Sequence, residues 1–337
     1  MVFASLSIRM RVDVEALNMV EALGAYGRHR TASILRPRPD KRGFRIIIAP
    51  AVSGQAVAYG YMATLVALAQ RKNLPVCDEC KEFQTRGGFV KHGTSKDSSL
   101  TEWRLVQECI VEDLTGFMVP EARIRRTSPV AFSYMLPDVE SSTVALDPQF
   151  HVRAPMPGQQ PQPFQVESGT AVYTVSVFVD VERIGRGYEK VQDTLSLMEL
   201  PLDSRKKRVE TAFEALGCLF EGLMFGAKKA RYLPVYEIIG TVAALSRPIP
   251  FMVSPARLSK DQNYIDVTIR RASSYALFLK DVGEELAVFY FDQEGVYDQS
   301  GTSSIQIGVT RADTFSDLID KVKSKAVEWI EAGAEQR

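Results

Sequence analysis

The segment Leu6-Ser-Ile-Arg-Met-Arg-Val-Asp-Val14 decides the fold class because its apolar and polar residues alternate with a period of two. This period is typical of a β-strand with one buried face and one open face. Arg9 and Arg11 lie on the face that we expect to be open. Two arginines there are unusual for a plain solvated sheet, so we expect this face to meet water or a partner.

After this strand we expect a basic segment, a second strand and then a helix. Residues 18–42 are basic and contain the breakers Gly24, Gly27, Pro37 and Pro39, which predict a loop or irregular segment. A second strand follows at residues 44–49. Ser53 is the expected N-cap of a helix that ends near Asn73. Its apolar stripe consists of Val57, Tyr61, Leu65 and Leu68.

In the second half of the chain, expected strands again alternate with expected helices. The expected elements are a strand at residues 173–181, a helix capped by Asp203, strands at residues 232–245 and 285–291, and a final helix capped by Thr314 with Asp317. The core faces of the two helices consist of Val209, Phe213, Leu216 and Phe220, and of Phe315, Ile319, Val322 and Trp329. The order strand, helix, strand, helix, strand predicts an α+β fold with a ferredoxin-like core of the RNA-recognition-motif type.

We expect this core to comprise residues 1–75 and 171–337, with a large insertion at residues 76–170. The insertion contains an expected helix at residues 100–111, whose Ser99 and Glu102 fit a capping box. It ends in the stretch Ala154-Pro-Met-Pro-Gly-Gln-Gln-Pro-Gln-Pro-Phe164. Such a composition buries too little apolar surface to order itself, so it predicts an exposed loop or the tip of a projecting hairpin.

Composition indicates a globular protein with an uneven distribution of charge. The 337 residues carry 41 basic and 41 acidic side chains, which argues against a histone-like protein. Residues 1–50 hold nine Lys/Arg against four Asp/Glu, and residues 280–337 hold six against twelve. A molecule polarised in this way can offer phosphate a basic face and can stack end to end with copies of itself.

The cellular setting is expected to be the cytoplasm. Four cysteines in a chain of this length favour a reducing compartment. The sequence contains no run of about 18 apolar residues, so we expect no membrane-spanning helix. The alternating residues from Ser5 onward do not resemble a signal peptide. We therefore expect no membrane association.

Several motifs suit the binding of a phosphate backbone. Ser53-Gly54-Gln55 is expected at a helix N-terminus, where free N–H groups attract phosphate, although an ordinary N-cap explains it equally. Gly226-Ala-Lys-Lys-Ala-Arg231 lacks the spacing of a Walker loop and suits either a backbone clamp or a solvated turn. Arg123-Ile-Arg-Arg-Thr-Ser128 offers three guanidinium groups, including Arg125 and Arg126, or forms a solvated surface strand. In Phe150-His-Val-Arg153, the side chain of His151 suits stacking on a base or a structural hydrogen bond.

Cys77-Asp-Glu-Cys80 has the spacing of two zinc ligands. No second Cys pair or His pair follows at finger spacing, although His92 and Cys109 could complete a site. One pair is a weak signal. We therefore expect no metal and no cofactor.

Catalysis finds little support among the residues. The chain has three histidines, His29, His92 and His151, and it lacks both the nucleophile elbow and the His-Glu-x-x-His motif. A metal-independent ribonuclease, with His29 as general base and Lys228 stabilising charge, is the alternative that these residues leave open. A DNA-binding regulator is disfavoured because no helix-turn-helix with a basic recognition helix is evident.

Together these segments resemble the archaeal DevR-type CRISPR-associated autoregulator family, the backbone protein of type I-A Cascade. The matching segments are Glu15-Ala-Leu-Asn18, Arg28-His-Arg-Thr31, Pro50-Ala-Val-Ser-Gly54, Gly116-Phe-Met118, Arg125-Arg-Thr-Ser128, Tyr134-Met-Leu-Pro137, Gln149-Phe-His-Val-Arg153, Ala171-Val-Tyr-Thr174 and Gly226-Ala-Lys-Lys-Ala-Arg-Tyr-Leu-Pro234. Each is weak singly, but their order and spacing from Leu6 to about Trp329 are specific.

The resemblance implies a hand-shaped, non-catalytic protein that polymerises along CRISPR RNA and presents it for pairing with target DNA. A thumb-like hairpin, expected at about residues 138–170, would reach over the guide. Other Cascade subunits and further copies of the chain would be partners. The RNA-binding residues implied by the match and the motifs are Asn18, His29, Arg30, Ser53, Gly54, Gln55, Arg123, Arg125, Arg126, His151, Arg153, Lys228, Lys229 and Arg231.

Overall fold

The computed structural model describes residues 1–23, 26–40, 42–155, 157–158, 160–192, 194–260, 262–298 and 307–335. Gly24 of the basic segment lies outside the described residues. Met156 and Gln159 of the Pro/Gln stretch also lie outside them. Among the described residues, no helix is long and apolar enough to span a membrane.

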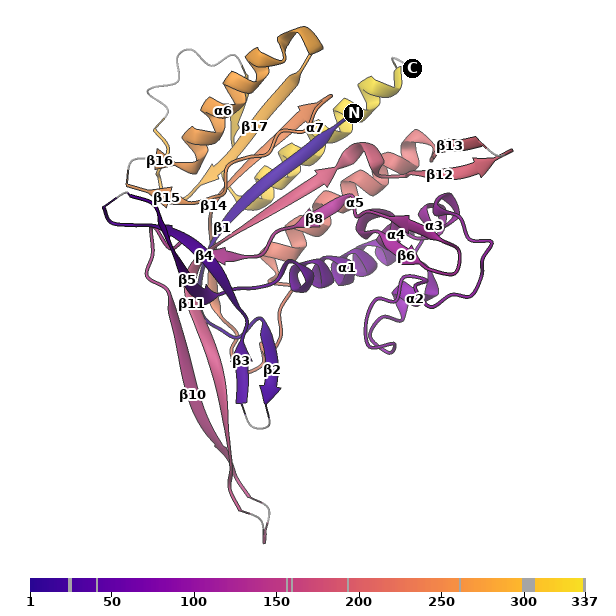
Figure 1. Cartoon of the computed structure of the whole chain (residues 1–337). Coiled ribbons are helices and arrows are strands. Elements are labelled where there is room, and N and C mark those ends of the chain that lie inside the picture. The colour runs from indigo at the N-terminus through magenta and orange to yellow at the C-terminus, as the bar shows by residue number, and fades with distance from the viewer. Residues whose placement is uncertain are drawn as a thin grey trace.

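A large mixed sheet forms the centre of the molecule (Figure 1). Strand β1 (Phe3–Glu15) runs antiparallel between β11 (Gln162–Asp180) and β14 (Val235–Arg247). Beyond β14 the sheet continues through β17 (Glu285–Asp292) and β18 (Gly308–Arg311). Beyond β11 it continues through β3 (Tyr26–His29) and β2 (Met19–Leu23), and β8 (Val130–Phe132), β9 (Leu136–Pro137) and β10 (Ala145–Arg153) also pair with β11.

Three helices cover one face of this sheet, as the apolar stripes predict. They are α1 (Gly54–Arg71), α5 (Leu202–Glu221) and α7 (Phe315–Glu335). Leu6, Ile8 and Met10 of β1 are fully buried beneath them. In α7, Thr314 Oγ1 accepts a hydrogen bond from Asp317 N–H at 3.1 Å, which confirms the expected cap. The apolar periodicity therefore identified the main core correctly.

The opposite face of β1 is closed, contrary to the expectation of an open face. Ser5 Oγ donates to Phe251 O at 2.8 Å, and Ser7 Oγ accepts from Ala256 N–H at 2.8 Å. The segment at residues 251–256 thus crosses the strand, and α6 (Tyr264–Phe278) packs farther along the same face. Arg9 is also buried, so of the two arginines on β1 Arg11 alone is exposed.

The buried guanidinium of Arg9 is neutralised within the protein. Its Nη1 lies 2.5 Å from Asp138 Oδ2, and its Nε lies 2.7 Å from Glu294 Oε2. Ser141 Oγ accepts a further hydrogen bond from Arg9 Nη2 at 2.9 Å. Two carboxylates from distant segments allow an arginine to occupy a position that the alternating sequence pattern predicts to be exposed.

The basic segment after β1 is more regular than its glycines and prolines predict. It contains β2, β3 and β4 (Thr31–Pro37), and β4 pairs with β5 (Phe44–Pro50). β3 is held by parallel pairing with β11, a contact distant in sequence. Strand formation here depends on that partner, which local composition does not reveal.

The region between α1 and β11 contains short elements. They are α2 (Asp78–Lys81), α3 (Glu102–Glu108), α4 (Ile110–Thr115), β6 (Phe117–Val119) and β7 (Ile124–Arg126), besides β8 to β10. Thr101, not Ser99, caps α3, because its Oγ1 accepts from Arg104 N–H at 3.1 Å. Likewise α5 begins after Pro201 without a side-chain cap, so the expected cap at Asp203 is wrong.

Strand β10 and the first part of β11 form a long hairpin that projects from the body (Figure 1). The Pro/Gln stretch lies at its tip, as its composition predicts. Elsewhere the smaller elements are η1 (Val181–Arg183), β12 (Arg186–Val191), β13 (Thr194–Glu199), β15 (Leu258–Ser259), β16 (Gln262–Asn263) and η2 (Lys280–Val282). The observed fold is therefore a mixed α and β structure with one large sheet and one extended projection.

Candidate nucleic-acid interface

Asn18 joins two of the segments that the sequence singled out. Its Oδ1 accepts a hydrogen bond from Ser53 N–H at 2.7 Å, and its backbone O accepts from Arg30 N–H at 2.7 Å. Ser53 in turn caps α1 by accepting from Ala56 N–H at 3.3 Å. These bonds hold the end of β1, the end of β3 and the start of α1 together.

The basic loop after α5 contacts the residue before Asn18. Gly226 has a φ of +89° and packs against Leu17, whose backbone O accepts from Ala227 N–H at 2.8 Å. Lys228 is exposed, and a Cβ at Gly27 would lie 3.0 Å from its Nζ. The loop therefore places an exposed cation beside β3.

Tyr232 connects this loop to the projecting hairpin, near the end of the β10–β11 ladder. Its N–H donates to Lys228 O at 3.3 Å, and its hydroxyl lies 2.8 Å from His151 Nε2. His151 also stacks on Phe164 of the facing strand, with ring centroids 5.1 Å apart. The sequence motifs did not single out Tyr232, although it lies one residue beyond the basic run.

We call the surface formed by Asn18, Gly27, His151, Lys228 and Tyr232 the junction surface. The exposed Arg28 and Arg231 flank it in sequence and add positive charge. Exposed cations that can contact phosphate suit a single-stranded nucleic acid of any sequence.

Two of the predicted residues, Arg30 and Lys229, already bond to other groups of the protein. Arg30 is half-buried, and its Nη1 donates to Tyr134 Oη at 3.5 Å. Lys229 Nζ donates to Leu223 O at 2.7 Å, and burial lowers the pKa of this lysine. Lys229 therefore serves the end of α5, whereas Arg153 and Gln55 are exposed.

The start of α1 is packed against protein, which corrects the expectation of a phosphate site at Ser53 and Gly54. Ser53 is 4% exposed, and both its N–H and its Oγ are already bonded. A Cβ at Gly54 would lie 2.6 Å from Phe132 O. The glycine thus admits a neighbouring strand, and Ser53 has the bonds of an ordinary N-cap.

His29 is fully buried and does not face a ligand. Its Nε2 lies 2.6 Å from Glu15 Oε1, and its Nδ1 lies 2.7 Å from Arg30 O. Burial acts to lower the pKa of His29, but the adjacent carboxylate outweighs burial, so the pKa is raised. The structure removes His29 from both the RNA-contacting set and the role of general base.

Arg126 is also structural. Its Nη2 lies 2.6 Å from Asp113 Oδ1, and its Nη1 lies 2.7 Å from Glu102 Oε1. Further hydrogen bonds to Arg183 O and Arg186 O, both at 2.8 Å, and from Nε to Asp113 O at 2.9 Å use its remaining donors. A guanidinium that is this buried and this fully bonded is not available to RNA.

Arg123 and Arg125 are exposed but lie apart from the junction surface. They belong to the turn and second strand of the β6–β7 hairpin, which packs beside α3. Figure 1 shows these elements on the side of the molecule away from β10. The arginine-rich motif therefore contributes a separate basic surface.

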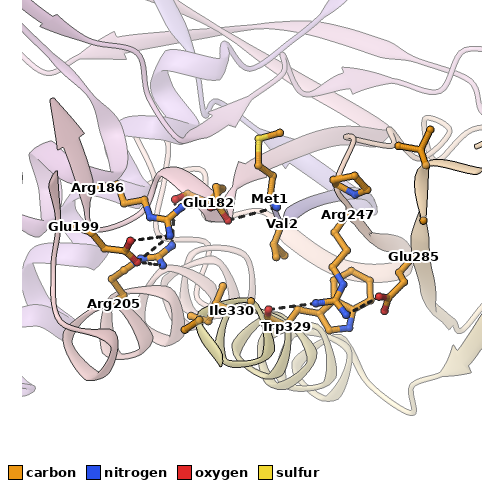
Figure 2. Close-up of a pocket in the computed structure, with 15 residues that line it drawn as sticks. Met1, Val2, Glu182, Arg186, Glu199, Arg205, Arg247, Glu285, Trp329 and Ile330 are labelled. Atoms are coloured by element: carbon orange, nitrogen blue, oxygen red, sulfur yellow. Dashed lines mark hydrogen bonds and ion pairs between the residues drawn. The ribbon is translucent and has the colours of Figure 1, made fainter. Parts of the chain in front are cut away.

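A pocket of about 570 Å³ between the chain ends offers no comparable site. Figure 2 shows that its arginines face carboxylates. Arg186 and Arg205 both contact Glu199, and Arg247 Nη2 lies 2.7 Å from Glu285 Oε1. Cations neutralised in this way have little remaining attraction for phosphate.

Comparison with known proteins identifies the family. Residues 6–269 match the family model described as CRISPR-associated negative auto-regulator DevR/Csa2. The chain belongs to this family. The match covers the greater part of β1, all of β11 and β14, the helices α1 and α5, and the projecting hairpin, which confirms the resemblance that the sequence segments indicated.

Relatives of this DevR/Csa2 chain occur in archaea. It is 32% identical to "CRISPR-associated protein Cas7/Csa2 1" of Saccharolobus solfataricus, over 86% of this chain and 92% of that protein. It is 31% identical to "CRISPR-associated aCascade subunit Cas7/Csa2 2" of the same organism, over 95% and 99%. A chain of a structure titled "CRISPR RNA-guided surveillance complex, pre-nicking" shares the fold, with a TM-score of 0.57 and 14% identity over 96% of this chain and all of that one.

Proposed function

We propose that this DevR/Csa2 protein is a non-catalytic backbone subunit of a type I-A Cascade complex. In this role it binds CRISPR RNA in the cytoplasm, polymerises along it and leaves its bases free to pair with invading DNA. Family membership supports the proposal, as does the relative named as an aCascade subunit. The other Cascade subunits are its proposed protein partners.

The core is proposed to be of the ferredoxin-like, RNA-recognition-motif type. Strands β14, β1, β11 and β8 are neighbours in that order, and the chain runs β1, α1, β8, β11, α5, β14. This β-α-β-β-α-β order is the one that defines the type. The proposed insertion at residues 76–170 therefore carries β8 of the core within it, and residues 138–170 contain the proposed thumb.

The observation that carries the function is the convergence of Asn18, His151 and Lys228 on one surface. Leu17, the neighbour of Asn18, bonds to the basic loop that carries Lys228. Tyr232 bonds to both Lys228 and His151. Such a surface grips the sugar-phosphate backbone without reading sequence. Base pairing by the guide then supplies the specificity, as in RNA-guided recognition generally.

Assembly along RNA is proposed to use the polarity of the chain. A basic N-terminal region and an acidic C-terminal region favour heterologous contacts between copies. Heterologous contacts that do not close produce an open helix. The projecting hairpin would then extend from one copy toward the RNA bound by the next.

The test is RNA binding by Lys228→Ala combined with Arg231→Ala. We expect affinity for two unrelated single-stranded RNAs to fall by a similar factor, at least about tenfold, because phosphate contacts are shared by all sequences. The salt dependence of log affinity should also become shallower by about 0.7 for each phosphate that the variant no longer neutralises. Fluorescence anisotropy over a salt series measures both.

Arg270→Ala with Lys280→Ala is the matched control. It also removes one arginine and one lysine, from exposed positions on α6 and η2. We expect this variant to bind RNA within about twofold of the unaltered protein. Equal losses in the two double variants, or a loss confined to one RNA sequence, would contradict a backbone clamp on the junction surface.

A further inference from the structure

Three cysteines that are separated in the sequence converge between α2 and α4. The Sγ atoms of Cys77, Cys80 and Cys109 all lie within 4.8 Å of one another. Cys80 and Cys109 are fully buried, and Cys77 is half-buried. Sequence spacing paired the first two, and only the tertiary structure brings the third to them.

Local backbone geometry holds this arrangement. Cys77 precedes α2, and its backbone O accepts from Cys80 N–H at 3.1 Å. Cys109 ends α3 and precedes α4, while Ile110 N–H donates to Pro75 O at 2.9 Å, which ties the two segments together. These bonds hold the three sulfur atoms at one place in the fold.

A histidine–carboxylate pair lies next to the thiols. His92 Nδ1 is 2.7 Å from Glu112 Oε1, and ligand atoms of both residues lie within 4.8 Å of Cys77 Sγ. Glu112 is fully buried, yet its Oε2 has no hydrogen-bond partner among the described residues. A buried carboxylate oxygen without a donor is costly unless a cation or a metal-bound group lies nearby.

We propose that Cys77, Cys80 and Cys109 bind one structural zinc ion, with His92 as the fourth ligand and Glu112 orienting its ring. Thiolate and imidazole are the ligands that Zn²⁺ prefers, and a set of four leaves no open position for catalysis. A carboxylate bonded to the other nitrogen of a ligating histidine is a recurrent arrangement in zinc sites. Zinc binding would displace the thiol protons into solvent, because the thiolates are the ligands.

The site would stabilise a part of the chain that has little regular structure of its own. Helix α2 has four residues, too few to be stable alone, and a long segment without strands separates it from α3. Helix α4 carries Asp113, which contacts Arg126 and Arg208 in the buried interior. A metal shared by α2 and α4 would therefore attach the segment at residues 76–101 to the core.

The first experiment measures metal in the full-length protein. The chain is produced with zinc in the medium, purified under reducing conditions, and analysed by elemental mass spectrometry. We expect about one zinc ion per chain, falling to below about one tenth in Cys77→Ser, Cys80→Ser and Cys109→Ser. Cys218→Ser is the control, because Cys218 is exposed on α5 and should leave the zinc content unchanged.

A second measurement does not depend on whether the cysteine variants fold. Titration of the unaltered protein with an organomercurial should release zinc in step with modification of the buried thiols. Protein loaded with Co²⁺ should show thiolate-to-cobalt absorption, and His92→Ala should alter its ligand-field bands and weaken competition against a chelator by at least about tenfold. Unaltered bands in His92→Ala would overturn the assignment of the fourth ligand.

The proposal fails outright if the reduced, full-length protein neither contains zinc nor takes it up on addition. A disulfide between two of the three cysteines in protein freshly prepared under reducing conditions would also overturn it. RNA binding is measured separately, so a failed zinc site and a failed junction surface remain distinguishable.

Discussion

At the scale of single residues, buried ion pairs decide which charged side chains are available to a partner. Glu15 Oε1 meets His29 and also accepts from Tyr173 Oη at 2.7 Å, while Glu15 Oε2 accepts from Leu17 N–H. His29 N–H donates to Glu167 Oε2 at 2.9 Å. These bonds occupy two acidic residues close to the junction surface, so neither carboxylate competes with RNA for the cations there.

His29→Ala should destabilise the fold in a pH-dependent manner. The folded-state pKa of His29 is raised above its value of about 6.5 in the unfolded chain. The stabilisation from the charged pair is therefore complete below pH 6.5 and is lost as pH rises through the folded pKa. We expect the variant to lose about 3 kcal/mol at pH 6 and clearly less at pH 9.

Urea unfolding at the two pH values measures this difference. Thr31→Ala, an exposed change on the adjacent strand, is the control and should behave alike at both. A loss for His29→Ala that is the same at pH 6 and pH 9 would show that the charged pair contributes nothing.

Arg125→Ala and Arg126→Ala should have different consequences despite being neighbours. Arg126 is buried among two carboxylates, so its loss should lower the free energy of unfolding by about 3–5 kcal/mol. Arg125 is exposed, so its loss should change stability by no more than about 0.5 kcal/mol. Guanidinium chloride unfolding measures both, and a stable Arg126→Ala protein would contradict the structural role.

At the scale of elements, α1 has a tightly packed start because a strand approaches it closely. Gly54 lies under the backbone of Phe132 at the end of β8. The strand order that places β8 beside β11 therefore requires a residue without a side chain at this position. A glycine that suggests a phosphate site in the sequence is explained here by packing.

Gly54→Ala should lower the free energy of unfolding by about 1–3 kcal/mol, because the added methyl group would overlap Phe132 O. Gly217→Ala in α5 is the matched control, since its Cβ would meet Ile319 Cγ2 at an ordinary 3.7 Å. The control should stabilise the helix by up to about 1 kcal/mol. Thermal unfolding followed by circular dichroism compares them, and equal effects would contradict the close approach.

At the scale of the whole molecule, the projecting hairpin is separate from the hydrophobic core. Phe150 and Val152 are 74% and 67% exposed. Apolar side chains at such exposure on a protruding element are typical of contact with a partner. By contrast, the hairpin contacts the body at His151, which bonds to Tyr232 and stacks on Phe164 two residue pairs before the ladder ends.

Replacing residues 152–163 with Asn-Gly should shorten the hairpin without unfolding the protein. His151 pairs directly with Phe164, so a two-residue turn can connect them. We expect stability to change by less than about 1 kcal/mol, because the removed described residues are mostly exposed. Affinity for a short RNA should persist, whereas assembly of several copies on a long RNA should be impaired.

Mass photometry on RNAs of increasing length measures this assembly. The full-length hairpin carrying Val152→Ser provides a milder comparison. Unimpaired assembly of the shortened protein would show that the hairpin does not contribute contacts beyond its own copy.

Several features could be predicted from local sequence because they are properties of short segments. The alternation at Leu6–Val14 indicated a strand, and the apolar spacing of α1 and α7 indicated the helices that cover it. Proline and glutamine at residues 154–164 indicated the exposed tip. Three cations near the end of α5 indicated one side of the junction surface.

Other features were decided by tertiary contacts. Ser5 is covered by a segment 246 residues away, Arg126 contacts Asp113 of α4, and Cys109 joins the pair of cysteines at α2. Periodicity records which residues are apolar, because burial of an apolar side chain needs only a core. The burial of a polar or charged side chain needs a particular partner, and only the folded chain determines which partner comes within reach.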